Sequence, residues 1–190
     1  ALEATKRALA DAGRSPPDLD MILAATTTPD YMFPGIGPLL QERLGLGTLG
    51  TMDIHNACSA FVYGLATADA FVRAGACRCV LVAGAEVQST GLDLSTAGRD
   101  MAVLFGDGAG AVLVEPSPAD HGILSWALPG EGACAKDLWA EGPTSLVQGR
   151  LTPEMFASGA MRPHMNGRQV FKHATTRFPE VILEVLERAG

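Results

Sequence analysis

Cys58 is the residue whose position in the sequence is best suited to chemistry. It follows a short segment, 52–54, in which apolar and polar residues alternate as in a strand, and it precedes the mostly apolar segment 59–73, which predicts a helix ending at Gly75. A cysteine at such a junction faces the positive end of the helix dipole, which favours the nucleophilic thiolate over the thiol. A buried packing cysteine is the plain alternative, and position alone leaves both interpretations open.

The other cysteines and the histidines lack the spacing of metal ligands. They are Cys77, Cys79, Cys134, His55, His121, His164 and His173. The pair at 77 and 79 is not a Cys-x-x-Cys motif, and it predicts core packing in a reducing compartment. We therefore predict no metal site. A base for Cys58 could come from His164 or His173 only if the fold brings one of them close.

Gly45, Gly47 and Gly50 match the dinucleotide pattern G-x-G-x-x-G letter for letter. That pattern binds a pyrophosphate when a strand precedes the glycines and a helix follows them. Here a helix is predicted before them and a strand after them, so we reject a phosphate site. We interpret this cluster as a helix end followed by a turn.

A second glycine cluster follows Phe105 and consists of Gly106, Asp107, Gly108 and Gly110. It leads into a strand, so it also fails the test for a dinucleotide site. Glycines at this density predict backbone at positive φ or backbone packed closely against another element. We expect a tight loop in the floor of a site.

The composition excludes several classes of protein. Of the 190 residues, 47% are hydrophobic and 18% are charged, which excludes a disordered chain and indicates deeply buried elements. The net charge of −7, without any cluster of Lys or Arg, argues against a nucleic-acid partner. No apolar run approaches the roughly 20 residues that span a membrane, and no signal-peptide pattern is present. We expect a soluble cytoplasmic protein.

Strand-like and helix-like segments alternate along the chain, which predicts an α/β fold with parallel strand pairing and right-handed crossovers. Polar, glycine-containing residues predict a loop at 89–100, and the Gly- and Pro-rich stretch 129–163 predicts a long loop or connection. The expected strands are 21–25, 52–55, 79–83, 111–114 and 122–126, and the expected helices are 2–12, 36–44, 59–73 and 166–189.

Five segments occur together in an order that is typical of one known family. They are TTTPD at 26–30, FP at 33–34, DIHNACSAFVYGL at 53–65, FGDGAGA at 105–111 and MNGRQVFK at 165–172. Together they resemble β-ketoacyl-acyl-carrier-protein synthase III of the thiolase superfamily. The resemblance covers almost the whole chain.

The resemblance implies a thiolase-like fold, a layered α/β/α arrangement with a mostly parallel, mixed sheet. It implies an N-terminal half with the nucleophile at 1–128, a connecting region at 129–163, and the first helix of the C-terminal half at 164–190. The chain opens inside a helical pattern without Met and closes at Gly190 directly after another, so we expect a fragment of a longer protein.

The implied activity is condensation of an acyl-CoA primer with malonyl-acyl-carrier protein, with loss of CO₂ and without a cofactor. Cys58 matches the family nucleophile, which takes the acyl group as a thioester, and its backbone N–H is expected to supply half of an oxyanion hole. The implied partners are acyl-CoA, acyl carrier protein and a second copy of the chain in a homodimer. The pathway is fatty-acid or polyketide initiation.

The resemblance also assigns roles to residues outside the nucleophile segment. Arg99 matches an arginine that contacts the CoA nucleotide, and Phe105 matches an aromatic residue that lines the acyl channel. Met165 and Gly167 match the segment beside the pantetheine tunnel. Phe33 resembles a residue that reaches across the dimer interface to close the neighbouring pocket. The plain alternatives are a solvated loop charge for Arg99 and core packing for Phe105.

One part of the family pattern is missing from these residues. The family's catalytic His and Asn lie in an H-Q-A-N-like motif after the next strand, and no such motif occurs here. These two residues polarise the malonyl carbonyl, so that decarboxylation can generate the carbanion. We expect that the 190 residues alone can accept an acyl group but do not form the carbon–carbon bond.

Other interpretations share the same motifs. A relative could use Cys58 to transfer an acyl group to oxygen or nitrogen, or to prime a polyketide pathway. A non-catalytic remnant that dimerises or binds a carrier protein belongs to a different functional class. An independent cysteine hydrolase is the least favoured, because the sequence offers no positioned His–Asp pair.

Overall fold

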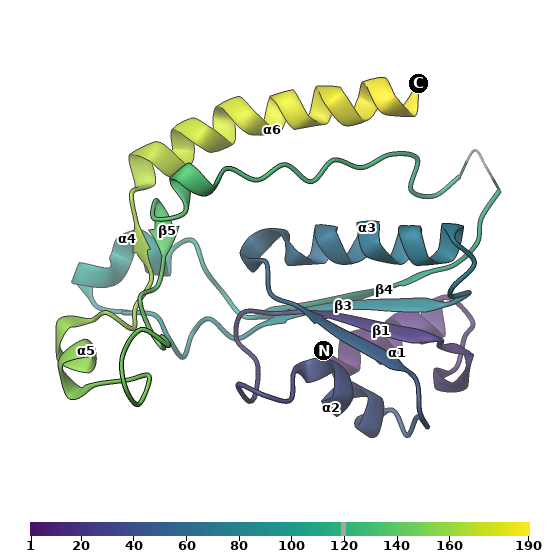
Figure 1. The fold of residues 1–190 in the computed structure, drawn as a ribbon, viewed down its shortest axis with the longest axis horizontal. Helices are drawn as coiled ribbons and strands as arrows, with labels where there is room; N and C mark the ends of the chain where they lie inside the picture. Colours follow the sequence, from purple (N-terminus) through teal and green to yellow (C-terminus); the bar gives the residue numbers. More distant parts are fainter. Residues whose placement is uncertain (119–120) are drawn as a thin grey trace. The chain divides into compact units, whose positions relative to one another are not determined.

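The structure is a computed structural model that describes residues 1–118 and 121–190, and it contains two compact units (Figure 1). Unit 1 comprises residues 1–87 and 107–124, and unit 2 comprises residues 88–106 and 125–190. Each unit is described by itself below. The division into 1–128, 129–163 and 164–190 stays a prediction.

A four-stranded sheet in the order β2-β1-β3-β4 forms the centre of unit 1. Its strands are β1 (Met21–Ala25), β2 (Gly50–Ile54), β3 (Val80–Glu86) and β4 (Gly108–Val114). β1 pairs in parallel with β2 and with β3, whereas β4 runs antiparallel to β3 with Glu86 opposite Gly108. The sheet is therefore mixed and mostly parallel, as predicted.

Helices cover both faces of this sheet, in an α/β/α arrangement. α1 (Leu2–Asp11) and α2 (Ile36–Arg43) lie on one face, and α3 (Ala60–Arg73) lies on the other (Figure 1). Because side chains alternate along a strand, Ile22 and Leu81 pack with α1 and α2, whereas Leu23 and Val82 pack on the side of α3. All four are fully buried, and each contributes about 1.5–3 kcal/mol relative to an exposed side chain.

The helices of unit 1 end next to the glycines that the sequence analysis took as stop signals. α2 is followed by Gly45, whose φ of 68° lies in the left-handed region that favours glycine. This confirms the interpretation of the first glycine cluster as a helix end and turn. Two short 3-10 turns complete the unit, at Pro16–Asp18 and Ala57–Ser59.

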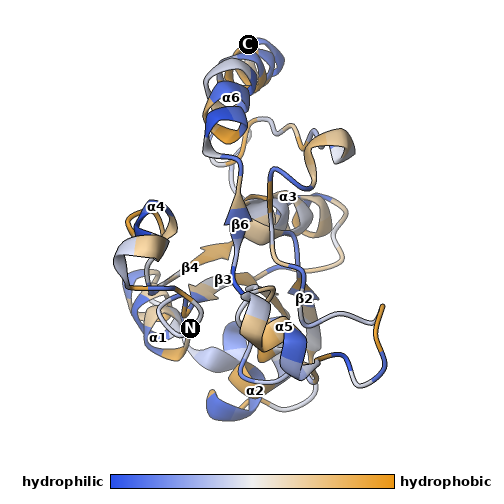
Figure 2. Ribbon diagram, turned by 90° about the vertical axis from the view of Figure 1, so that its left-hand side faces the viewer, coloured by the Kyte–Doolittle hydropathy of each residue, from blue (hydrophilic) through white to orange (hydrophobic). Residues whose placement is uncertain are grey.

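Unit 2 has less regular structure and one long helix. β5 (Leu138–Trp139) pairs antiparallel with β6 (His164–Met165). α6 (Gly167–Ala189) is 23 residues long and carries hydrophilic and hydrophobic residues along its length (Figure 2). The Asn166 side chain accepts a hydrogen bond from the Gln169 N–H and caps its start. The remaining elements are α4 (Arg99–Ala102), α5 (Pro153–Ser158) and 3-10 turns at Thr96–Gly98 and Gly132–Cys134.

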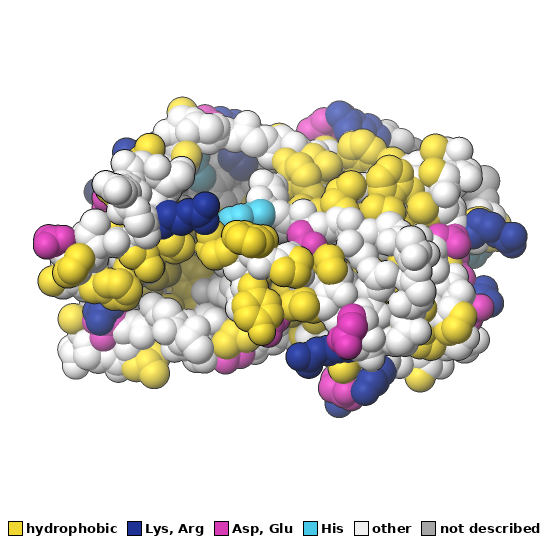
Figure 3. Space-filling model, turned by 60° about the horizontal axis from the view of Figure 1, so that its bottom comes forward, with side chains coloured by type: hydrophobic (Ala, Val, Ile, Leu, Met, Phe, Trp, Pro, Cys, Tyr) yellow, Lys and Arg dark blue, Asp and Glu magenta, His cyan; other side chains and the backbone are white. Residues whose placement is uncertain are grey.

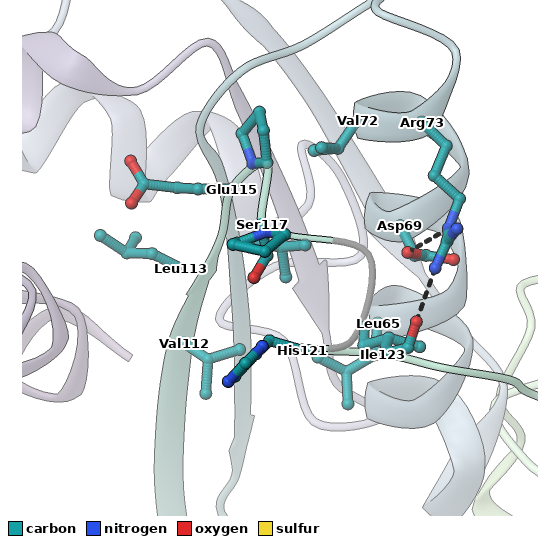
Figure 4. A pocket seen from close by; sticks show the side chains of 14 residues that line it. Leu65, Asp69, Val72, Arg73, Val112, Leu113, Glu115, Ser117, His121 and Ile123 are labelled. Atoms are coloured by element: carbon teal, nitrogen blue, oxygen red, sulfur yellow. Dashed lines mark hydrogen bonds and ion pairs between the residues drawn. The ribbon is translucent and has the colours of Figure 1, made fainter. Parts of the chain in front are cut away.

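The strand predicted at 122–126 does not form. The Ile123 carbonyl instead accepts a hydrogen bond from Arg73 Nη2 at 2.6 Å, and Arg73 Nε donates to Asp69 at 2.7 Å (Figure 4). These groups line a hollow of about 400 Å³ beside α3 and β4. A short apolar run does not distinguish a strand from an irregular segment fixed by side-chain contacts, which is why the prediction was wrong.

Two further expectations need revision. The glycine segment 108–110 belongs to strand β4 and is not a loop. The stretch 129–163, expected as a loop, contains β5 and α5. Among the helices that the structure describes, none is both long enough and apolar enough to cross a membrane.

Gly64 lets α3 approach the sheet closely. A Cβ atom at this position would lie 2.8 Å from Val82 Cγ1, inside van der Waals contact, and Val82 is fully buried. The branched valine side chain has little freedom to turn away. The close seating of α3 therefore depends on the missing side chain at this position.

We expect Gly64→Ala to destabilise the protein by roughly 1–2 kcal/mol in urea unfolding. Overpacking costs about 1–3 kcal/mol, and the better helix propensity of alanine returns only about 0.5–1 kcal/mol. Gly47→Ala is the matched control, because a Cβ there meets no atom within 4 Å. Equal or greater stability of Gly64→Ala would contradict the close packing of α3.

Candidate active site

Cys58 lies in the turn that joins β2 to α3, as the sequence predicted. It is the central residue of the 3-10 turn Ala57–Ser59, and it is the exposed one among the four free cysteines. The turn is closed by Ser59, whose N–H and hydroxyl both donate to the Asn56 carbonyl, at 3.3 and 3.0 Å. Cys58 is thus presented at the start of the 14-residue helix α3.

The residue before Cys58 has an unusual backbone conformation. Ala57 has a φ of 46°, in the left-handed region where a residue with a Cβ costs roughly 1–2 kcal/mol. Backbone strain of this kind gathers at functional sites, because the surrounding structure must maintain it. Ala57 is a site feature that the sequence analysis missed, since an alanine gives no signal of a positive φ.

A hollow of about 310 Å³ lies beside Cys58. Its walls come from the end of β1, the end of β3, the start of β4 and the start of α3. Most of its lining residues are Ala or Gly, so that much of the surface is backbone. They are Ala25, Ala57, Cys58, Ala60, Phe61, Gly84, Ala85, Glu86, Gly108, Ala109 and Gly110.

Glu86 is the charged side chain of this lining, and it fixes the neighbouring loop. Its carboxylate accepts hydrogen bonds from the Thr27 N–H at 2.8 Å, the Thr27 hydroxyl at 3.0 Å and the Thr28 hydroxyl at 2.9 Å. The Thr28 hydroxyl in turn accepts the Val87 N–H at 2.8 Å. The threonines follow β1 and Glu86 ends β3, and parallel strands end at the same edge of a sheet. That arrangement was a signal for this contact in the sequence.

The second glycine cluster differs from its prediction in conformation. Gly106, Gly108 and Gly110 do not adopt positive φ, and a Cβ at any of them would meet no atom within 4 Å. Neither a left-handed backbone nor close packing therefore explains these glycines. Gly108 and Gly110 nevertheless line the hollow beside Cys58, where the absence of side chains leaves strand β4 bare.

Most of the other predicted site residues lie in unit 2, whose structure is described by itself. Arg99 is the exposed first residue of α4, and Phe105 is half-buried. Met165 lies in β6, and Gly167 is the first residue of α6. These four residues and Gly106 belong to unit 2, whereas Asp107 belongs to unit 1. Their predicted roles in binding CoA and the acyl chain stay predictions.

Phe33 lies in the loop before α2 and is 79% exposed. Its neighbours Tyr31 and Met32 are also exposed, at 61% and 66%. Apolar side chains reach the surface in several groups on the face drawn in Figure 3. Such exposure is what a residue that packs against a second copy requires, but the dimer role of Phe33 stays a prediction.

The two histidines considered as bases for Cys58 lie in unit 2 and contact other side chains there. The His164 ring lies 6.1 Å from the Trp139 ring, centroid to centroid. His173 Nε2 lies 3.4 Å from Cys134 Sγ. Neither contact involves Cys58, and a role for either histidine as its base stays a prediction.

The comparisons with known proteins agree with this geometry. Residues 52–132 match the family model for 3-oxoacyl-[acyl-carrier-protein] synthase III. The β-ketoacyl-[acyl-carrier-protein] synthase III of Bordetella petrii is 45% identical over 190 residues, which is 100% of this chain and 55% of that protein. The enzyme of the same name from Geobacillus kaustophilus is 42% identical over 187 residues, 98% of this chain and 54% of that protein.

Solved structures give the same result for the fold. The 3-oxoacyl-[acyl-carrier-protein] synthase III of Aquifex aeolicus superposes with a TM-score of 0.86 at 38% identity, over 100% of this chain and 56% of that one. The priming β-ketosynthase of the R1128 polyketide pathway superposes with a TM-score of 0.80 at 31% identity, over 100% of this chain and 54% of that one.

The fold and the strand–cysteine–helix turn place the chain in the thiolase-like α/β class. Within that class it is similar over its whole length to proteins named 3-oxoacyl-[acyl-carrier-protein] synthase III, which confirms the resemblance inferred from the sequence. The chain spans about half the length of the curated relatives that it matches.

The remaining cysteines are less exposed than Cys58, and the pKa of each is raised above the ordinary value. Burial, with the Glu115 carboxylate nearby, raises the pKa of Cys79 to about 12. Burial also raises the pKa of Cys77, with a smaller effect from Asp20, and the pKa of Cys134 is raised by burial and by Glu131 and Asp137. At neutral pH these three thiols hold their protons more firmly than an ordinary cysteine does.

We therefore expect iodoacetamide at limiting concentration to alkylate Cys58 first. The exposed Cys58 is accessible to the reagent, and a thiol with a raised pKa reacts slowly because less of it is thiolate. Peptide mapping by mass spectrometry at neutral pH measures the order of modification. Modification of the buried Cys79 before Cys58 would contradict this account of the four cysteines.

Proposed function

We propose that this chain carries the acyl-accepting part of a β-ketoacyl-acyl-carrier-protein synthase III. The observation that supports this most strongly is the setting of Cys58, which is exposed on a strained turn at the start of α3 and lines a hollow walled by Ala and Gly backbone. An exposed thiol beside a cavity with few side chains suits a nucleophile that must hold an acyl group.

In the proposed first step, the Cys58 thiolate attacks the carbonyl carbon of an acyl-CoA thioester. The new bond between Sγ and the acyl carbon forms, the bond to the CoA sulfur breaks, and CoA leaves as a thiolate that takes up a proton. The thiolate is the nucleophilic form of a cysteine. We expect the Cys58 N–H to supply one donor to the oxyanion of the tetrahedral intermediate.

In the proposed second step, malonyl-acyl-carrier protein loses CO₂, and the resulting carbanion attacks the acyl carbon on Cys58. The carbon–sulfur bond breaks, so that the Cys58 thiolate is regenerated and the β-ketoacyl-carrier protein is released. Neither step needs a cofactor, because the electrons for carbon–carbon bond formation come from decarboxylation. The 190 residues contain no H-Q-A-N motif, so we do not assign the groups that stabilise the carbanion to this chain.

The proposed partners are acyl-CoA, acyl carrier protein and a second copy of the chain, with Phe33 at the interface between copies. We place the reaction at the initiation of fatty-acid synthesis, or of polyketide synthesis, in the cytoplasm. The similarity to a priming β-ketosynthase from a polyketide pathway supports including polyketide synthesis.

The acyl-transfer step predicts a covalent intermediate. Incubation with acetyl-CoA should add one acetyl mass to the intact chain, located on Cys58 by peptide mapping. Cys58→Ala should lose this addition completely, because no other exposed thiol is present among the four cysteines. Cys77→Ala is the matched control and should be acetylated normally. Acetylation of Cys58→Ala to the wild-type level would overturn the assignment of the nucleophile.

Condensation is tested separately from the acetylation of Cys58. With acetyl-CoA and malonyl-acyl-carrier protein present, we expect these 190 residues to form no β-ketoacyl product, even where Cys58 is acetylated. The reason is that the chain lacks the His and Asn that polarise the malonyl carbonyl in the family. Mass spectrometry of the carrier protein measures whether a β-ketoacyl group has formed on it. Steady turnover to β-ketoacyl product would show that other residues of this chain perform that step.

A further inference from the structure

Unit 2 contains a cluster of a thiol, an imidazole and a carboxylate that the proposed reaction does not use. Cys134 Sγ lies 3.4 Å from His173 Nε2. One carboxylate oxygen of Glu131 completes a group in which the three atoms lie within 4.8 Å of one another. Cys134 and His173 are half-buried and Glu131 is exposed, so the cluster is open to solvent on one side.

Two elements fix the cluster. Glu131 directly precedes the 3-10 turn Gly132–Cys134, and Cys134 is its last residue. Residues three apart on such a turn lie above one another on the same side. His173 comes from the second turn of α6, whose start is capped by Asn166. The histidine is 39 residues from the cysteine in sequence, so ligand spacing could not reveal this cluster.

We infer that Glu131, Cys134 and His173 form a binding site for a zinc-class divalent cation. Thiolate sulfur, imidazole nitrogen and carboxylate oxygen are the three ligand types that zinc takes from proteins. Tetrahedral zinc with ordinary bond lengths holds a sulfur and a nitrogen ligand about 3.5 Å apart. The observed separation of 3.4 Å between Sγ and Nε2 is close to this value.

The surrounding charges favour a cation at this position. Besides Glu131, the Asp137 carboxylate lies 4.0 Å from His173 Nε2. A divalent ion binds a cysteine as its thiolate: the metal–sulfur bond forms, the sulfur–hydrogen bond breaks, and the proton is released to solvent.

One positive group competes for the same carboxylate. Arg177 Nη2 lies 3.3 Å from Glu131, but Arg177 Nη1 also donates to Glu180 at 2.9 Å. Glu131 can therefore turn toward a cation while the guanidinium keeps Glu180 as its partner. Three protein ligands leave a fourth position for water or an exogenous ligand. The cluster borders a cavity of about 460 Å³ that could admit one.

Cobalt(II) is the probe for this site, because it replaces zinc in tetrahedral sites and absorbs visible light. The full chain, freed of metal with a chelator, should bind one cobalt ion with a sulfur-to-cobalt charge-transfer band, and added zinc should remove the band. Proton release measured in weak buffer should accompany binding. Cys134→Ser should lose the sulfur-to-cobalt charge-transfer band, and His173→Gln should lose the visible bands of tetrahedral cobalt. Both variants should keep the far-ultraviolet circular dichroism of the wild-type chain.

Cys77→Ser is the matched control, because Cys77 is a half-buried cysteine of unit 1 and should leave the cobalt spectrum unchanged. Two results would overturn the inference. One is the absence of a sulfur-to-cobalt band in the wild-type chain. The other is a band that persists in Cys134→Ser but disappears in Cys58→Ala, which would assign the ion to the exposed cysteine. The readout is independent of acyl transfer, so it succeeds or fails separately from the proposed function.

Discussion

The close seating of α3 on the sheet is the constraint on which the candidate active site depends. Gly64 removes the side chain that would strike Val82, and Gly84 performs the same role for Phe61, which would meet a Cβ there at 3.0 Å. Two glycines, one on the helix and one on β3, thus set the distance between the two layers. Since Cys58 lies at the start of α3, that distance also fixes where the thiol stands relative to the strand ends.

The site that results is made largely from backbone. Strands β1 and β3 end beside Cys58, the antiparallel β4 begins there, and nearly all the residues at these ends are Ala or Gly. Glu86 contributes a carboxylate whose hydrogen bonds hold the threonine loop after β1 in place. The strained φ of Ala57 persists because both β2 and α3 are packed on either side of it.

Much of this fold could be predicted because local patterns and tertiary packing agree. The run at 21–25 is apolar throughout and became a strand buried on both faces, and the junction before Cys58 formed between strand and helix. The errors have one physical origin, which is that local sequence carries no information about distant partners. In the segment 122–126, Arg73 binds the Ile123 carbonyl where a strand was expected, and His173 contacts Cys134 although the two are far apart in the sequence.

A crystal structure of the chain after incubation with acetyl-CoA tests the central claim most directly. The account predicts continuous electron density from Cys58 Sγ to an acetyl group, with the acetyl carbons inside the hollow between Phe61 and the strand residues Gly84 and Gly108. Density for an acetyl group on another cysteine, or an acetyl group on Cys58 that points away from this hollow into solvent, would contradict it.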